Sequence, residues 1–488
     1  MKIISQRYTV NESNFHNVDY LRNLNLLEIL ILLLVPALII GPAVAEIILL
    51  CSIIIFVFFI NRDTKENKFL LDNKFIYFFV FFYFFFFINT LISNTPIIVS
   101  LKILFFVRFI FLLLIINFIL NKNKNFLINL SKVTLITFII LFLDALFQKL
   151  MGYNLLGQQV INNFRISSFF GEELVMGGYI ARFAPILLFG FFLFKNRKIQ
   201  FLFFFTYIVS YYFVLISGER AAAVTSVIGF LYLVIFLDIK KSHLIKFIIT
   251  IITMLIIFIY TDNNIKIRMI DHYKIQISQK YLFAETQKLK KLESEKISSI
   301  VKELEKISID TKMSTKQKEQ KKMELENEQK EIEKKIFKIN SLNENKFVKL
   351  IPNQLILLNK TSINMFRQNK LLGQGPYSFK YYCNDKVQNI KCSGGHPHNS
   401  YLQLLLETGT IGFLYFLIPL IFLIFFQFKL RLKKKKNTLN YNQFTIASCL
   451  VFIILWPINQ NGNIFNNWLN IAYYLSFSIY IYFLKKKI

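Results

Sequence analysis

Residues 29–60 read ILILLLVPALIIGPAVAEIILLCSIIIFVFFI, and this stretch decides the fold class. An apolar run of about 17 to 25 residues is long enough to cross the hydrocarbon core of a bilayer as a helix. The stretch covers most of two such runs, near 24–40 and 44–60, which are separated by the Gly41-Pro42 break. It therefore predicts a tight hairpin of two membrane-spanning helices.

Apolar runs of this length recur along the whole chain. Its 488 residues are 55% hydrophobic and 17% aromatic, with a mean hydropathy of +0.47, which is too apolar for a soluble protein. We therefore predict an all-α integral membrane protein with about twelve transmembrane helices. The spans after the first hairpin are expected near residues 75–91, 98–120, 126–147, 173–194, 200–217, 221–238, 245–261, 401–428, 441–458 and 466–484.

The basic residues mark one side of the membrane. The formal net charge is +29, but most Lys and Arg residues stand in short clusters between apolar runs. Cytoplasmic loops carry such an excess, so both termini are predicted to be cytoplasmic, together with the loops NRDTKENKFLLDNK, NKNKN, KNRK, DIKKSHLIK and KLRLKKKKN. This distribution argues against a nucleic-acid partner, because basic residues that bind phosphates usually line one face of a soluble domain. The first apolar run is also too long for a cleavable signal peptide.

The opposite side of the membrane receives one very long loop. The alternation gives spans 1 to 9 in residues 1–261, a periplasmic loop over 262–400, and spans 10 to 12 in 401–488. Long irregular loops are usually functional or disordered. We therefore expect function in this loop and in the shorter outer loops at 148–172 and 217–221.

The first part of the long loop is a charged segment. Residues 274–346 are rich in Lys, Glu, Gln, Ile and Leu and contain no Pro or Gly. Apolar residues recur at spacings of three, four or about seven, and the stretch SIDTKMSTKQ (308–317) interrupts them. The pattern predicts a solvated helical hairpin; a single charged helix or a partly disordered spacer is the alternative.

The last part of the loop, residues 371–400, forms a predicted compact cap with two cysteines and two histidines. Cys383 and Cys392 lie outside the membrane on this topology, where they can form a disulfide. A zinc site that combines them with His396 and His398 is the alternative. Eight residues separate the cysteines, where two to four are typical, and the proline between the histidines should keep them extended and pointing apart.

His398 stands just before the span that begins at residue 401, so it lies at the membrane edge. It either caps that helix or faces a cavity as a general base. Asn399 and Ser400 are better N-cap residues, which favours the second interpretation. His396 is then expected to position or hydrogen-bond the reacting groups.

A second polar cluster surrounds the outer turn LISGERAAAV. Arg220 can offer a guanidinium fork to a phosphate or pyrophosphate between helices. The alternative is an arginine that reaches lipid headgroups or pairs with Glu219. The segment NFRISSFFGEELVMGGYIARF adds Arg165, Glu173 and Arg182 on the same side. Arg182 lies inside a predicted span, where an unpaired charge costs about 2.5 to 3.5 kcal/mol, and this implies a partner or a wet cavity.

Three motifs together resemble the O-antigen ligase and polymerase family of bacterial membrane glycosyltransferases. They are SGERAA, LLGQGPYSF and HPHNSYLQLLLETGTIGF, and the resemblance covers residues 164–428. On this resemblance Arg220 binds the donor pyrophosphate and His398 is the essential histidine. The supporting residues are Gly373 and Gly375 of the Gly-x-Gly loop, Asn399 of the His-Asn pair and Glu407 of the following Glu-x-Gly. The candidates for the family's second functional arginine are Arg367 and Arg268.

The resemblance implies a GT-C-like enzyme of the bacterial inner membrane. Such an enzyme takes a glycan from undecaprenyl pyrophosphate and transfers it to a sugar hydroxyl of a lipid A core or similar acceptor at the periplasmic face. A histidine and arginines suffice for this chemistry, so no metal or other cofactor is expected. The alternatives are a polymerase of the same family that extends a growing glycan, and a non-enzymatic polysaccharide transporter or flippase.

Overall fold

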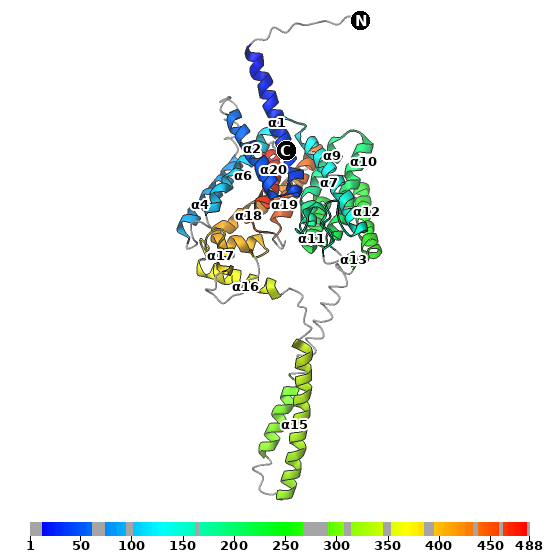
Figure 1. Cartoon of the computed structure of the whole chain (residues 1–488), viewed down its shortest axis with the longest axis vertical. Coiled ribbons are helices and arrows are strands. Elements are labelled where there is room, and N and C mark those ends of the chain that lie inside the picture. Colours follow the sequence, from blue (N-terminus) through cyan, green and yellow to red (C-terminus); the bar gives the residue numbers. More distant parts are fainter. Residues whose placement is uncertain are drawn as a thin grey trace. The chain divides into compact units, whose positions relative to one another are not determined.

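The computed structural model describes residues 12–60, 74–93, 101–161, 165–266, 291, 293–306, 314–344, 353–384, 395–432, 438–457 and 462–485. These residues are helical apart from turns, loops and two isolated β-bridges. The elements, shown in Figure 1, are α1 (Glu12–Ile40), α2 (Pro42–Ile60), α4 (Lys74–Ile92), η1 (Leu101–Phe106), α6 (Val107–Lys122), α7 (Phe126–Met151), η2 (Ser168–Phe170), α8 (Met176–Phe183), η3 (Ala184–Ile186), α9 (Leu187–Leu193), α10 (Arg197–Ile216), α11 (Arg220–Phe236), α12 (Lys241–Thr261), α13 (Asn263–Lys266), α15 (Thr315–Glu344), α16 (Asn353–Gln368), α17 (Ser378–Asn384), α18 (Ser400–Leu432), α19 (Thr438–Leu455) and α20 (Asn467–Lys485).

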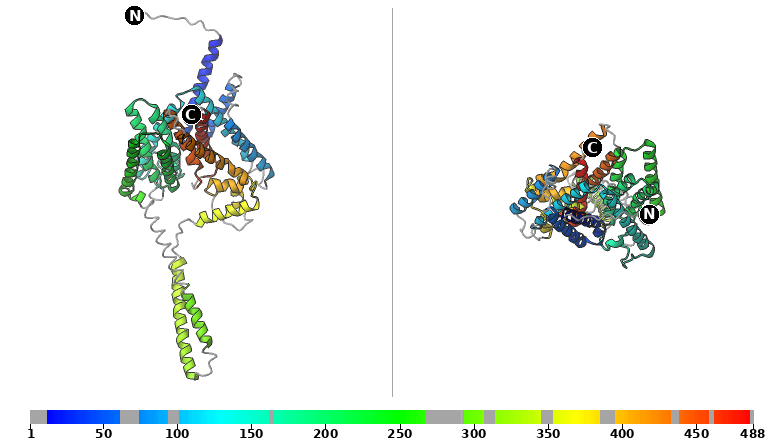
Figure 2. Two further views of the ribbon diagram at one scale, coloured as in Figure 1. Left: turned by 180° about the vertical axis from the view of Figure 1, so that it is seen from behind. Right: turned by 90° about the horizontal axis from the view of Figure 1, so that it is seen from above.

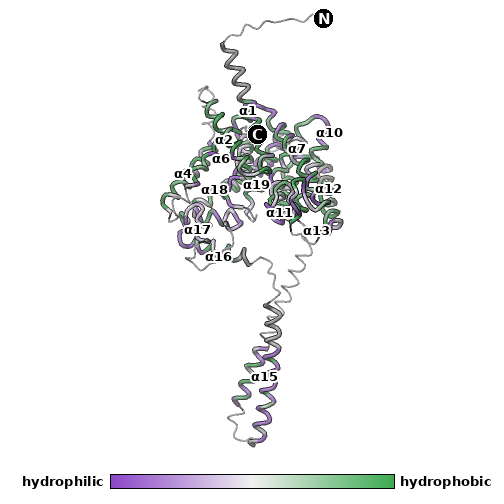
Figure 3. Tube along the Cα trace, viewed as in Figure 1, coloured by the Kyte–Doolittle hydropathy of each residue, from purple (hydrophilic) through white to green (hydrophobic). Residues whose placement is uncertain are grey.

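The expected all-α membrane architecture is confirmed in its class. Within the described ranges, six helices are long and apolar enough to cross a membrane: Lys74–Ile92, Lys102–Lys122, Phe126–Met151, Met176–Leu193, Arg197–Ile216 and Ser400–Leu432. The shorter apolar helices are Leu24–Ile40, Pro42–Phe58, Arg220–Phe236, Ile248–Thr261 and Leu439–Leu455. The number of twelve spans stays a prediction. Figure 3 shows the apolar colouring of helices such as α4 and α12 and the hydrophilic colouring of much of α15.

The chain divides into two units, residues 1–265 with 357–488, and residues 266–356. In the first unit, two ion pairs join helices that are distant in the sequence. Lys149 at the end of α7 pairs with Asp262 after α12, and Arg108 of α6 pairs with Glu46 of α2 at 2.9 Å.

Helix α20 lies inside the first unit. All its residues from Leu469 to Leu484 are buried, and it packs against α2, α6 and α19 (Figures 1 and 2). Its sequence mixes Tyr, Ser and Asn with apolar residues, because an internal helix packs against protein on all sides. Polar side chains of α20 can therefore take part in an internal site.

Two expected spans are interrupted. The span predicted at 173–194 is divided into α8, η3 and α9, because Pro185 lacks a backbone N–H and its ring disfavours a continuous helix. The span predicted at 401–428 begins as α18, but Gly409 has φ 66° and ψ −166° and breaks the helix. A helix break exposes carbonyl groups that need partners, and these are described below.

The second unit contains two helical segments. Residues 293–306 and α15 share an apolar cluster of Ile300, Leu325 and Ile332, with Ile297 and Leu304 packed against it. Met323 is 68% exposed. The cluster is small, so these helices are largely solvated along their length.

Candidate functional site

The buried carboxylate of Glu219 holds the start of α8. Its Oε1 accepts a hydrogen bond from the backbone N–H of Gly177 at 2.6 Å, and its Oε2 accepts one from Gly178 at 3.1 Å. A carboxylate at a helix N-terminus satisfies N–H groups that lack partners within the helix. A Cβ atom at Gly177 would overlap the Ser217 hydroxyl and lie 3.1 Å from Oε1, so the close approach requires glycine.

Three arginines surround this carboxylate. Arg182 of α8 donates from Nη1 to the carbonyl of Gly178 at 2.8 Å, and Arg165 donates from Nε to the carbonyl of Ser217 at 3.3 Å. Both arginines interact electrostatically with Glu219, and the positive charge of Arg220 repels that of Arg165. The structure therefore brings together four of the predicted site residues, from the loop after α7, from α8 and from the α10–α11 turn.

The cluster carries excess positive charge. Three guanidinium charges and one carboxylate leave a net charge of two positive units when Glu219 is ionised. Burial raises the pKa of Glu219 to about 7, against the opposing effects of the Gly177 and Gly178 N–H groups and of Arg165 and Arg182. Burial also lowers the pKa of Arg165, with a further decrease from Arg220 and an opposing increase from Glu219. Such a partly buried basic cluster suits a multiply charged anion.

The two cap histidines lie against each other. The ring centroids of His396 and His398 are 4.2 Å apart at an interplanar angle of 59°, so the expectation that the proline keeps them apart was wrong. His398 has a positive φ of 59°, which turns the chain after Pro397 and returns its ring toward His396. Burial lowers the pKa of His398, and burial followed by the charge of His398 lowers that of His396 to about 4. Both imidazoles are therefore neutral at pH 7.

Asn399, not His398, caps α18. Its Oδ1 accepts a hydrogen bond from the backbone N–H of Leu402 at 3.0 Å, and its Nδ2 donates to the carbonyl of Pro457 at 2.8 Å. The helix-cap interpretation of His398 is thus wrong, and its imidazole, which neighbouring atoms cover only in part, is left for another role. Within the described part of the chain, the Nε2 atom of His396 is buried without a hydrogen-bond partner.

Tyr473 of α20 connects the two groups, and sequence reasoning missed it. Its hydroxyl lies within interaction range of both Arg182 and Ser400, the first residue of α18. Tyr473 and Ser400 are each 1% exposed, and neither hydroxyl makes a hydrogen bond to the described residues. The signal in the sequence was the set of tyrosines and serines within this predicted span. A buried tyrosine hydroxyl usually has a hydrogen-bond partner, and Arg182 of α8 and Ser400 of α18 are the polar side chains within its reach.

The Gly-x-Gly loop docks into the break of α18. The backbone N–H groups of Gln374 and Gly375 donate to the carbonyls of Leu406 and Glu407 at 2.9 and 2.8 Å. Gly373 has φ +69°, and a Cβ atom there would lie 2.5 Å from the carbonyl carbon of Glu407. The loop thus satisfies the carbonyl groups that the helix break exposes.

The Glu407 side chain holds the same region from inside. It is 1% exposed, and its Oε1 accepts from the backbone N–H of Phe379 at 3.1 Å, while its Oε2 accepts from Gln403 Nε2 at 3.1 Å. The Gln403 amide in turn contacts Asn463 and Ile464. Glu407 and the two loop glycines therefore shape the cap, and none of these contacts reaches the histidines.

The remaining predicted residues are not brought into either cluster by a described contact. Glu173 is exposed before α8, and Arg367 is exposed at the end of α16. The Cys383 side chain, Cys392 and Arg268 lie outside the described residues, so the disulfide stays a prediction. In the described part of the chain, no group of three His, Cys, Asp or Glu side chains is arranged to hold a metal ion.

Comparison with known proteins bears on the cap and α18. Residues 354–417, which include the Gly-x-Gly loop, both histidines and Glu407, match the family model of the O-antigen ligase. No curated protein matches the chain. The resemblance drawn from the sequence motifs is confirmed. This match over residues 354–417 supports a membrane function of the O-antigen ligase or polymerase type.

Proposed function

We propose that this protein transfers a glycan from undecaprenyl pyrophosphate to a sugar hydroxyl of a lipid A core or similar acceptor, at the periplasmic face of the inner membrane. One observation carries the proposal: the Tyr473 hydroxyl lies within reach both of Arg182 in the arginine cluster around Glu219 and of Ser400 at the start of α18, two residues after His398. The cluster supplies charge for a leaving pyrophosphate, and the imidazole supplies a base for an acceptor hydroxyl.

The donor end of the reaction needs fixed cations. When the bond between the anomeric carbon and the pyrophosphate oxygen breaks, the electron pair remains on that oxygen and the leaving group gains a negative charge. Arg165, Arg182 and Arg220 are proposed to hold the two phosphates, with Arg220 as the main ligand. Guanidinium groups in a partly buried site stabilise this developing charge more than they stabilise the ground state.

The acceptor end needs a base that is neutral before it reacts. His398 is proposed to take the proton from the attacking hydroxyl as the new carbon–oxygen bond forms. Burial lowers its pKa, so at pH 7 its imidazole is in the form that accepts a proton. His396 lies 4.2 Å away, between ring centroids, and helps to fix the ring orientation of His398. Attack opposite the leaving pyrophosphate inverts the anomeric centre.

Tyr473 is proposed as a positioning residue between the two ends. Its buried hydroxyl makes no hydrogen bond to the described residues and lies within reach of Arg182 and Ser400. A phosphate oxygen of the donor can accept this hydrogen bond, which orients the leaving group relative to α18. Tyr473→Phe should therefore lower kcat with a smaller change in the donor KM.

The proposal is tested with purified full-length protein in lipid nanodiscs, an undecaprenyl-pyrophosphate-linked glycan and either of two acceptors. Transfer to a lipid A core is expected for the ligase. Transfer only to the non-reducing end of a second lipid-linked glycan would identify the polymerase instead. Glycan translocation across vesicles without any new glycosidic bond would contradict both enzymes.

A further inference from the structure

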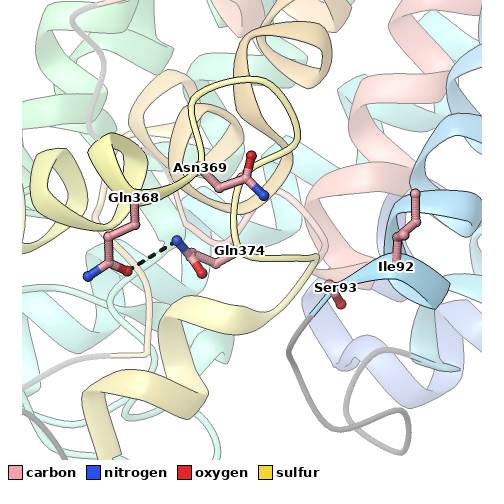
Figure 4. Close-up of a pocket in the computed structure, with 6 residues that line it drawn as sticks. Ile92, Ser93, Gln368, Asn369 and Gln374 are labelled. Carbon is pink, nitrogen blue, oxygen red and sulfur yellow. Dashed lines mark hydrogen bonds between the residues drawn. The ribbon is translucent and has the colours of Figure 1, made fainter.

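A polar cavity lies between the end of α4 and the turn that follows α16. Its volume is about 240 Å³, and it is lined by Ile92, Ser93, Gln368, Asn369, Gly373 and Gln374. Figure 4 shows Ile92 and Ser93 on one wall and the three carboxamide side chains on the facing wall. The only apolar side chain in the lining is that of Ile92, and no lining residue carries a charge.

The walls of this cavity are held in place before any ligand binds. Asn89 of α4 donates from Nδ2 to the carbonyl of Leu372 at 2.6 Å, which joins the two walls. Gln374 donates from Nε2 to the carbonyl of Met365 at 2.9 Å and to Oε1 of Gln368 at 3.2 Å, the dashed line in Figure 4. The backbone N–H of Gln374 also binds α18 through the carbonyl of Leu406. Preorganised walls reduce the entropic cost of binding.

The lining offers hydrogen-bonding groups of both kinds. The side-chain oxygens of Gln368 and Asn369 accept hydrogen bonds from Gln374 Nε2 and from the backbone N–H of Leu372. Within the described residues, the amide nitrogens of the same two side chains donate to no protein atom. The Ser93 hydroxyl donates to the carbonyl of Thr90 and keeps its oxygen as an acceptor. The Oδ1 atom of Asn89, on the same turn of α4, is buried without a partner. Asn89 itself is 3% exposed.

We propose that this cavity binds one neutral sugar residue of a glycan. Uncharged amides and hydroxyls match the donors and acceptors of sugar hydroxyls, whereas a phosphate would call for a cation in the lining. The exposed Ile92 side chain offers an apolar surface for the C–H face of a sugar ring. The volume lies just below the range of about 300 to 1,000 Å³ that suits drug-sized ligands, which fits a single ring.

The inference deepens the proposed function and rests on it, because the sugar would belong to the donor or acceptor glycan. The lining contains no His398 and no arginine, so the site would select the glycan and leave the bond-forming chemistry to other residues. Sugar binding in this cavity should therefore contribute to the affinity for the glycan. A substitution that impairs the cavity should raise the KM for the glycan and leave kcat within about twofold.

Binding is measured by saturation-transfer NMR on the full chain in nanodiscs. The probes are the methyl glycosides of glucose, galactose and N-acetylglucosamine, together with maltotriose, at concentrations on the order of 1 mM. Gln368→Leu removes a donor, and Ser93→Phe fills the cavity. The matched control is Asn364→Leu, which changes an exposed amide one turn earlier on α16.

At least one probe is expected to saturate the wild-type protein, with affinity reduced about five- to tenfold by Gln368→Leu and by Ser93→Phe and unchanged by Asn364→Leu. Equal binding by all variants, or no binding of any probe to the wild type, overturns the inference. Because binding is read without turnover, a protein that binds sugar but transfers none would refute the proposed function alone.

Discussion

The backbone N–H of Gly177 donates a 2.6 Å hydrogen bond to Oε1 of Glu219, and this bond ties the start of α8 to the start of α11. The same carboxylate interacts with Arg165 and Arg182. One acidic side chain therefore sets both the backbone geometry and the net charge of the arginine cluster. Its protonation state should control how strongly the cluster holds an anion.

Donor affinity should accordingly rise as the pH falls through about 7. Burial raises the pKa of Glu219 to about 7, so protonation removes its negative charge and increases the net charge of the cluster from two to three positive units. The pKa values of His396 and His398 lie below the usual 6.5, so these imidazoles do not account for a change near pH 7. A glycosyl pyrophosphate diester keeps two charges in this range. Its Kd should fall about five- to twentyfold from pH 8 to pH 6.

Glu219→Gln is the control for this pH dependence. It keeps an acceptor for one N–H group and cannot titrate, so its donor affinity should be nearly flat over the same range. The lost charged hydrogen bond should destabilise the protein by about 1 to 3 kcal/mol in thermal unfolding. An unchanged pH slope in the Gln variant would assign the titration to another group.

Arg220→Lys should lower kcat/KM for the lipid-linked donor by about 10- to 150-fold. A lysine keeps the charge but cannot supply the bidentate fork, and a hydrogen bond to a charged group contributes about 1.5 to 3 kcal/mol. Arg197→Lys is the matched control, because Arg197 is exposed at the start of α10 and away from the α10–α11 turn. Similar kinetics for both variants would refute the role of Arg220 in pyrophosphate binding.

Gly373→Ala should prevent stable folding of the cap. The residue has φ +69°, and its new Cβ atom would lie 2.5 Å from the carbonyl carbon of Glu407, so strain and steric overlap add. We expect a loss of more than about 3 kcal/mol, measured by thermal unfolding in detergent. Gly157→Ala is the control, because Gly157 has φ +81° and no atom within 4 Å of the added Cβ. It should cost only about 1 kcal/mol. Equal losses would show that backbone strain alone is responsible.

Much of this architecture follows from the periodicity and length of the apolar runs. The Gly41-Pro42 break separates α1 from α2 as expected, because glycine and proline act locally. The charged residues around Glu219 could also be identified from the sequence as candidate site residues, since ionisable groups near predicted membrane spans are rare. These features depend on residues close together in the sequence, so a single chain reveals them.

Other features depend on contacts between distant segments. The positive φ of His398 brings the two imidazoles together, although the sequence suggested an extended His-Pro-His segment. Tyr473 meets Arg182 only because α20 lies inside the bundle. The polar cavity at the end of α4 likewise needs α4 and the Gly-x-Gly loop to be joined by Asn89. No local sequence pattern indicates any of these contacts.

The charged segment over residues 274–346 should be dispensable for bond formation. Its helices form their own apolar cluster through Ile300, Leu325 and Ile332, and their exposed surface mixes Lys and Glu. Replacement by a flexible Gly/Ser linker should leave kcat for a small soluble acceptor within about threefold, because no proposed reacting group lies in this segment. A well-folded deletion variant without activity would contradict this expectation.

His398→Ala should abolish measurable transfer, because general-base catalysis contributes about 10²- to 10⁴-fold. Donor Kd should change little, since the pyrophosphate is held by arginines. Burial lowers the pKa of His398 below its usual 6.5, so wild-type kcat at saturating donor should stay level from pH 8 to about 6.5 and fall only at lower pH, as the base becomes protonated.

His396→Ala is the comparison that separates a base from a supporting residue. Its pKa of about 4 leaves it neutral throughout this range, so its loss should reduce kcat by about tenfold or less and keep the acid limb of the profile. Removal of His398 takes away only the smaller of the two effects that lower the pKa of His396; burial remains, so His396 should titrate at a higher pH than in the wild type but still below 6.5 in NMR spectra. Transfer by His398→Ala within about threefold of wild type, or activity that a chelator removes and zinc restores, would refute the proposed base.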